Sequence, residues 1–215
     1  MIAVVEKLHE LEAPTESVRR QLTELAERLE SKDGDTNDHA TAVAALAVAI
    51  AAELKIDGEQ LRHVELGALL HDVGKLSVPD RILKKPSHLT QLEWTVMRNH
   101  PSTGERLLIR ILDLPDVLAV VRSHHERWDG AGYPDGLQGA KIPLGARIVA
   151  VADAFQAMLE RRAYRPPRSR AEALAELIVS AGTHFDPACV DALRRLLERQ
   201  EVESRSSVDS PATAI

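Results

Sequence analysis

The chain has 215 residues, of which 44% are hydrophobic and only 3% are aromatic. This length suits one domain with a packed core, and an apolar fraction carried mainly by Ala and Leu favours close-packed helices over strands. The formal net charge of −6 argues against a protein that binds DNA or anionic lipid through a broad positive surface, so we expect neither DNA nor a membrane as a partner.

Cysteine content and hydropathy indicate the compartment. Cys189 is the single cysteine, which excludes an internal disulfide and suits a reducing environment. No stretch reaches the roughly 18 uncharged apolar residues that are typical of a membrane span. We therefore expect a soluble, cytoplasmic protein.

Residues 1–34 are predicted to form a helical lead-in segment. Residues 18–29 have the pattern of a charged amphipathic helix, with Pro14 and Thr15 before it and Gly34 after it. Two interpretations remain open: a helix through which the protein forms a homodimer, or simply the first helix of the domain.

Residues 35–200 are predicted to form one all-α domain. Apolar periodicity favours helices over residues 39–54, 59–71, 116–125, 143–157 and 186–200. Three pairs have the spacing of a capping box, which marks a helix start: Thr90 with Glu93, Ser102 with Glu105, and Ser169 with Glu172. Residues 201–215 are predicted to be a disordered tail.

Residues 126–142 interrupt this helical pattern. The segment holds Gly130, Gly132, Gly136, Gly139 and Pro134, residues that favour turns and break helices. We predict an ordered, functional loop here.

Histidine and aspartate side chains stand near the ends of several predicted helices. His71-Asp72 ends one of them and is followed by Lys75. Imidazole and carboxylate are ligands of borderline divalent metals, and a carboxylate can bridge two ions. Comparable candidates elsewhere in the chain are His39, His100, His124, His125 and Asp153. Polar groups at helix ends can converge at one end of a helical bundle, but periodicity alone does not establish that they do.

Longer motifs identify a family. Residues 71–75, HDVGK, resemble the metal motif of HD phosphohydrolases, and residues 124–134, HHERWDGAGYP, resemble the signature loop of the HD-GYP family. Residues 79–86, 100–104, 142–153 and 185–187 match further segments of that family, so the resemblance covers about residues 35–197. Members of the family are helical bundles of the HD-domain type that hydrolyse cyclic di-GMP, to the linear dinucleotide pGpG or onward to GMP, and related cyclic dinucleotides can also be substrates.

The resemblance implies roles for individual residues. The metal ligands are expected to be His39, His71, Asp72, His100, His124, His125 and Asp153, with Asp72 as the bridging carboxylate. Lys75 corresponds to the lysine that contacts the scissile phosphate. Tyr133, Arg162 and Arg165 correspond to positions implicated in nucleotide binding.

The chemistry explains why such residues are needed. A phosphodiester is anionic and repels hydroxide, whereas two divalent ions activate a water molecule as hydroxide and neutralise the phosphate oxygens. Lys75 adds positive charge where the transition state gathers negative charge. We expect two ions, with Fe or Mn favoured and other divalent metals possible, because His and carboxylate ligands do not select sharply.

Three positions depart from the family pattern. Ala42 stands where the family often has Arg, and Gln156 stands where it often has a second Asp. Asp35 stands where some members have a Glu that helps to hold a third ion; the shorter Asp side chain favours two ions. The first two changes affect groups that orient ligands and do not remove a ligand.

These departures leave rival functions open. One is a receptor or signalling module that binds a cyclic dinucleotide but turns it over poorly, and another is an HD phosphohydrolase acting on a different nucleotide. Residues 1–34 are too short for a sensory domain, so regulation by a protein acting in trans is a further expectation. Glu126 and Asp129 are predicted to order the signature loop through hydrogen bonds.

Overall fold

The structure is a computed structural model that describes residues 15–33, 36–160 and 166–208. Helices dominate these ranges, which contain no β-strand, only an isolated bridge between Ala181 and Phe185. The all-α prediction is confirmed. The elements, in chain order, are α2 (Glu16–Asp33), α3 (Thr36–Glu53), α4 (Gly58–Leu70), η1 (Val73–Ser77), α5 (Asp80–Leu83), α6 (Gln91–Met97), α7 (His100–Leu108), α8 (Pro115–Ser123), η2 (Gly139–Lys141), α9 (Leu144–Leu159), α10 (Arg170–Val179) and α11 (Pro187–Val208).

Four helices form the centre of the bundle. Helix α3 packs against α4 and α9, while α8 packs against α4 and α9 on the other side. Their contact faces bury Ile50, Leu66, Val121 and Ile148 almost completely. Buried alanines on α3 and α9, such as Ala47, let these helices approach closely. The core is therefore tightly packed with few aromatic residues.

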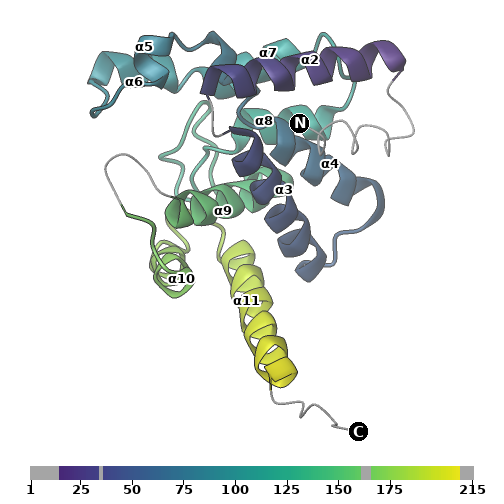
Figure 1. The fold of residues 1–215 in the computed structure, drawn as a ribbon, viewed down its shortest axis with the longest axis vertical. Coiled ribbons are helices and arrows are strands. Elements are labelled where there is room, and N and C mark those ends of the chain that lie inside the picture. Colours follow the sequence, from purple (N-terminus) through teal and green to yellow (C-terminus); the bar gives the residue numbers. More distant parts are fainter. Residues whose placement is uncertain (1–14, 34–35, 161–165, 209–215) are drawn as a thin grey trace, which may run out of the picture.

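Outer helices close the bundle at both ends. Helix α2 lies along the upper edge in Figure 1, against η1 and α3, while α10 and α11 pack on the lower side. Leu22 of α2 is fully buried in the same core as α3 and α4. Helix α2 therefore packs as part of the bundle. A domain boundary at residue 34 stays a prediction.

Two expected helix ends are wrong. The second capping box, at Ser102, does not start a helix, because α7 already begins at His100 with Asn99 as its N-cap and a proline in its first turn. The last helix continues to Val208 instead of ending near Gln200, so the expected tail is helical over residues 201–208. Arg194 and Glu198 form an i,i+4 ion pair on this helix, and no Gly or Pro follows until Pro211.

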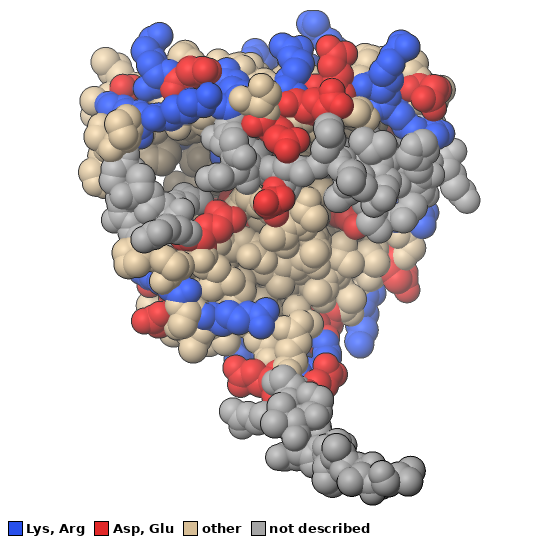
Figure 2. All heavy atoms as spheres, viewed as in Figure 1, with Lys and Arg blue, Asp and Glu red and all other residues tan. Residues whose placement is uncertain are grey.

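The charged surface is mixed in sign. Figure 2 shows Lys and Arg interleaved with Asp and Glu along the α2 edge, whereas uncharged side chains occupy the middle of this face. None of the described helices combines the length with the apolar character that crossing a bilayer requires. On the face shown, attraction of an anionic ligand therefore depends on local groups and not on a broad positive field.

Candidate metal centre

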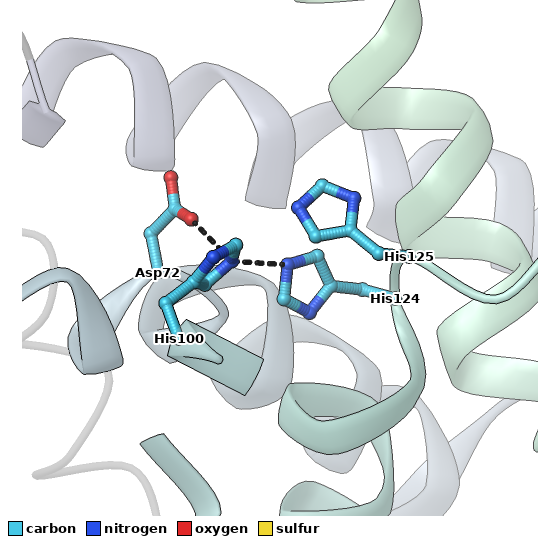
Figure 3. A group of neighbouring side chains, drawn as sticks. All are labelled: Asp72, His100, His124 and His125. Carbon is cyan, nitrogen blue, oxygen red and sulfur yellow. Dashed lines mark hydrogen bonds and ion pairs between the residues drawn. The ribbon is translucent and has the colours of Figure 1, made fainter. Parts of the chain in front are cut away.

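Asp72 stands between two groups of potential metal ligands. One group is Asp72 with His100, His124 and His125, and the other is His39 with His71 and Asp72. Within each group the ligand atoms lie within 4.8 Å of one another. Figure 3 shows the first group, in which Asp72, His100 and the adjacent pair His124 and His125 converge from three segments of the chain. Because Asp72 belongs to both groups, its two oxygens can serve two ions at once.

The chain segments that meet here need a close backbone contact. His71 caps the end of α4, and Asp72 immediately precedes η1. A Cβ atom at Gly74 would lie only 1.9 Å from the carbonyl oxygen of His100. Gly74 therefore lets η1 lie directly against the start of α7, which brings Asp72 to His100 at 3.3 Å between Oδ1 and Nε2.

Three of the histidines share one orientation. In each, Nδ1 donates to the carbonyl of the residue three positions earlier, at 2.6 Å for His71, 2.9 Å for His100 and 2.9 Å for His124. A carbonyl oxygen only accepts hydrogen bonds, so Nδ1 must carry a proton. In the neutral ring the lone pair is then on Nε2, the atom that faces the cluster.

These Nε2 atoms fit a cation. His71 Nε2 is buried and makes no well-aligned hydrogen bond to the described residues, although Asp72 Oδ2 lies 3.3 Å from it. His100 Nε2 and His124 Nε2 lie 3.3 Å apart, which sets two lone pairs against each other when both rings are neutral. A divalent ion would satisfy all three nitrogens, and the mixture of imidazole and carboxylate suits such an ion.

The electrostatics point in the same direction. Burial would raise the pKa of Asp72, but the charges of Lys75 and His71 hold it well below its usual range. Burial would lower the pKa of His71, but the Asp72 carboxylate raises it to about 9. Burial, aided by the neighbouring His125, keeps the pKa of His124 well below normal. The centre is therefore a buried anion that attracts positive charge, here the charge of Lys75 and of His71, beside the His124 ring, which burial keeps neutral.

His39 and Asp153 adjoin this centre from α3 and α9. His39 Nε2 lies 3.1 Å from Asp153 Oδ1, and the rings of His39 and His71 are 5.9 Å apart. Burial would raise the pKa of Asp153, but the hydrogen bond from His39 keeps it below its usual value. The structure thus brings together all seven residues predicted as ligands, although Asp153 contacts His39 and is not itself in either group of closely spaced ligand atoms.

Lys75 also reaches the centre. Its Nζ donates to Asp72 Oδ2 at 2.6 Å, so the predicted lysine lies beside the proposed bridging carboxylate. The other predicted cations, Arg162 and Arg165, lie outside the described residues, as does Asp35.

The Gly-rich loop, residues 126–142, is built around one buried carboxylate. Glu126 accepts hydrogen bonds from three backbone N–H groups, those of Asp135 at 2.7 Å, Gly136 at 3.1 Å and Leu137 at 3.1 Å. Asp129 similarly accepts from the backbone N–H of Ala131 at 3.0 Å. The prediction that both carboxylates order the loop is confirmed.

This ordering sets Tyr133 over the metal centre. A Cβ atom at Gly132 would lie 2.3 Å from the backbone nitrogen of Arg127, so Gly132 allows the loop to fold back on its own start. The Tyr133 ring then lies 5.0 Å from the His125 ring. A flat aromatic face thus borders the ligand cluster, where it could stack with a base.

Sequence reasoning did not anticipate two residues at the site. The Arg98 guanidinium, exposed at the end of α6, lies 5.4 Å from the Tyr133 ring centroid. The Glu160 carboxylate lies 2.6 Å from His39 Nδ1. For Arg98, its place two positions before His100 was a weak signal in the sequence. For Glu160, nothing in the local pattern indicated a role.

Comparison with known proteins places these features in context. The sequence profile of the HD domain family matches residues 3–189. The cyclic di-GMP phosphodiesterase response regulator RpfG of Xanthomonas campestris is 44% identical over 184 residues, which cover 84% of this chain and 48% of that protein. The 3'3'-cGAMP-specific phosphodiesterase 2 of Vibrio cholerae is 34% identical over 182 residues, covering 83% of this chain and 34% of that protein.

A solved structure shares the fold. Bd1817, an HDG"Y"P protein from Bdellovibrio bacteriovorus, superposes with a TM-score of 0.63 at 23% sequence identity, covering 76% of this chain and 52% of that chain. The present chain spans half or less of the length of the two curated relatives described above.

Proposed function

The chain belongs to the HD domain family, in its HD-GYP branch, and from this membership we propose that it is a metal-dependent phosphodiesterase that hydrolyses cyclic di-GMP to linear pGpG, to GMP, or to both. The observation that carries the proposal is the pair of ligand groups that share Asp72 beneath the ring of Tyr133. A phosphodiester needs positive charge on both sides of the reacting phosphorus, and a stacking surface for its bases.

Two divalent ions are proposed, with Fe or Mn favoured. One ion would be held by His100, His124, His125 and Asp72, the other by His39, His71, Asp72 and Asp153. When bound, the ions supply Lewis acidity that lowers the pKa of water and neutralises phosphate oxygens. The buried partners of the histidine Nδ1 atoms keep these ligands oriented for that purpose.

The chain's own residues complete the site. Asp72 holds Lys75 Nζ at 2.6 Å, which positions a cation beside the phosphate to stabilise negative charge in the transition state. Tyr133 offers its ring to a base of the substrate, and Arg98 offers a forked cation over that ring. Arg162 and Arg165 stay proposed as further nucleotide contacts.

The substrate is proposed to be cyclic di-GMP or a related cyclic dinucleotide. RpfG is named for cyclic di-GMP, whereas the Vibrio cholerae relative is named for 3'3'-cGAMP. The greater identity to the former favours cyclic di-GMP.

Hydrolysis by metal-loaded protein tests the proposal. Wild-type protein prepared without oxygen and loaded with Fe²⁺ or Mn²⁺ should convert cyclic di-GMP, and chromatography should identify pGpG or GMP. Asp72→Ala should abolish turnover, whereas Asp113→Ala, a change at an exposed loop aspartate, should leave it intact. The enzymatic proposal would be contradicted if Asp72→Ala still turned over the substrate. It would also be contradicted if wild type showed no turnover with any divalent ion.

A second candidate is a receptor that binds the dinucleotide and turns it over slowly. It is favoured by Ala42 and Gln156, which stand where family members often carry charged groups. Calorimetry and turnover on the same metal-loaded sample separate the two functions: tight binding with no product supports the receptor. A substrate panel likewise tests action on another nucleotide.

A homodimer through helix α2 is also proposed. Helix α2 keeps a charged outer face while its apolar face is buried within the bundle, so a homodimer through this helix would use that outer face. A regulatory protein acting in trans stays a proposal as well. Light scattering over a range of protein concentrations tests the dimer.

A further inference from the structure

We infer that Glu160 is a positioning residue for the ion held by His39, an inference that rests on the proposed metal-dependent function. Glu160 Oε1 lies 2.6 Å from His39 Nδ1, while His39 Nε2 lies 3.1 Å from Asp153 Oδ1. The imidazole is therefore held between two carboxylates, one on each ring nitrogen.

His39 differs in this respect from three of the other histidines. His71, His100 and His124 each direct Nδ1 to a neutral backbone carbonyl within the same turn. His39 instead uses a charged acceptor 121 positions away in the chain. When an ion takes the place of the proton on Nε2, an anionic partner at Nδ1 makes the ring a stronger electron donor than a neutral carbonyl does.

Helix α9 links this carboxylate to a proposed ligand. Asp153 lies within α9, and Glu160 caps its end, where the Glu160 N–H donates to the Gln156 carbonyl at 3.1 Å. One rigid helix thus delivers both the carboxylate at His39 Nε2 and the carboxylate at His39 Nδ1. The spacing between the two is set by helical geometry and not by a loop.

Glu160 does not belong to either group of closely spaced ligand atoms. Its side chain is 39% exposed, compared with 12% for His39, so it reaches the ring from the solvent side. The geometry points to an outer partner that orients a ligand, and not to a ligand of the ions.

Stepwise metal titration tests the inference. Wild-type apoprotein, Glu160→Ala and Glu160→Gln are titrated with Mn²⁺ against a chelator of known affinity, and bound metal is counted by elemental analysis. Removal of an outer partner typically lowers metal affinity by roughly 10–100-fold, so Glu160→Ala should weaken one of the two ions to that extent and leave the other unchanged. Glu160→Gln keeps an acceptor without the charge and should fall between Glu160→Ala and wild type.

Controls separate positioning from loss of structure. Glu198→Ala removes a carboxylate paired with Arg194 on α11 and should leave both affinities unchanged. The melting temperature of the apoprotein should be nearly the same in all variants, because the side chain is partly exposed. Equal affinity of Glu160→Ala and wild type for both ions, or equal weakening of both ions, would overturn the inference.

The titration also distinguishes this inference from the proposed function. If wild type binds two ions and Glu160→Ala weakens one, yet no dinucleotide is cleaved, the inference stands and the enzymatic proposal fails. If wild type binds no divalent ion, both are overturned.

Discussion

Gln156 Nε2 donates a hydrogen bond to the carbonyl oxygen of Ala42 at 3.4 Å, which joins α9 to α3 behind His39 and Asp153. These are the two positions where the sequence departs from the Arg and Asp that family members often carry. The bond goes to the backbone of Ala42, so it shows that the two departures are neighbours in space. An uncharged amide and a methyl group thus stand side by side where family members often carry two charged side chains.

This pairing predicts a coupled pair of substitutions. Gln156→Asp alone should lower the free energy of unfolding by about 1–3 kcal/mol, because a carboxylate would face a carbonyl oxygen without a donor. Adding Ala42→Arg should recover a large part of that loss, with a coupling energy of about 0.5–3 kcal/mol between neighbouring sites. Urea unfolding of the apoprotein completes the double-mutant cycle, and strictly additive effects would contradict the pairing.

Gly74→Ala should be severely destabilising. The new Cβ would overlap the His100 carbonyl oxygen, since the two would be 1.9 Å apart, and relief of the overlap would separate η1 from α7. We expect a loss of about 3 kcal/mol or more in unfolding free energy, at the upper end for overpacking, together with weak metal binding. Gly58→Ala is a matched control, because Gly58 has φ +55 but no atom within 4 Å of a built Cβ, and it should cost only about 1–2 kcal/mol.

Glu126→Gln should disorder the Gly-rich loop. The amide nitrogen cannot accept the bonds that a carboxylate oxygen accepts from the backbone, and each hydrogen bond to a charged group contributes about 1.5–3 kcal/mol. The dissociation constant for cyclic di-GMP should rise by about tenfold or more, while two ions still bind. Calorimetry with metal-loaded protein measures both quantities; unchanged nucleotide affinity would contradict the role of this carboxylate.

Arg98→Ala should weaken substrate binding more than turnover. The guanidinium lies over the Tyr133 ring, and a cation over an aromatic face contributes about 0.5–1 kcal/mol at an exposed site. We expect KM to rise by roughly two- to fivefold with a smaller change in kcat. Arg98→Lys should retain part of the effect through its charge, whereas Arg106→Ala, which removes a guanidinium bonded to Thr103, should behave as wild type.

Cys189 should be unreactive in the folded protein. Burial raises the pKa of its thiol from 9.0 to about 12, so the thiolate fraction at pH 8 falls by a factor of about 1,000. A chromogenic disulfide reagent should therefore modify the native protein far more slowly than the urea-unfolded chain. The same shift favours the folded state below pH 9, and that contribution is lost as the pH rises from 9 toward 12. Equal rates of modification in the two states would contradict the burial.

Sequence reasoning identified residue types and helix periods more readily than long-range contacts. His71-Asp72 and His124-His125 were recognisable from local motifs, and the all-α fold followed from apolar periodicity. The helix start predicted at Ser102 was wrong, because α7 begins at His100 and has Pro101 in its first turn. Local spacing cannot show how distant chain segments pack. The residues that hydrogen-bond the proposed metal ligands from other helices therefore could not be predicted.

Glu160 illustrates that limit. It ends a helix in a sequence context typical of a solvent-exposed glutamate, and its partner His39 is 121 residues away. Glu126, in contrast, lies next to the loop that it organises, so its role could be predicted from its neighbours. Contacts within about a dozen residues were accessible from the sequence, whereas those across the bundle required the packing of α3 against α9.

The membership of Asp72 in both ligand groups has a consequence for metal supply. On the proposed function, the first ion to arrive neutralises part of the carboxylate charge, so the second ion meets a weaker attraction. The protein would then pass through a half-loaded, inactive form over an interval of metal concentration. When the metal is scarce, cleavage would stop while the protein still held one ion. The rate of second-messenger breakdown would then depend on the concentration of that metal in the cell.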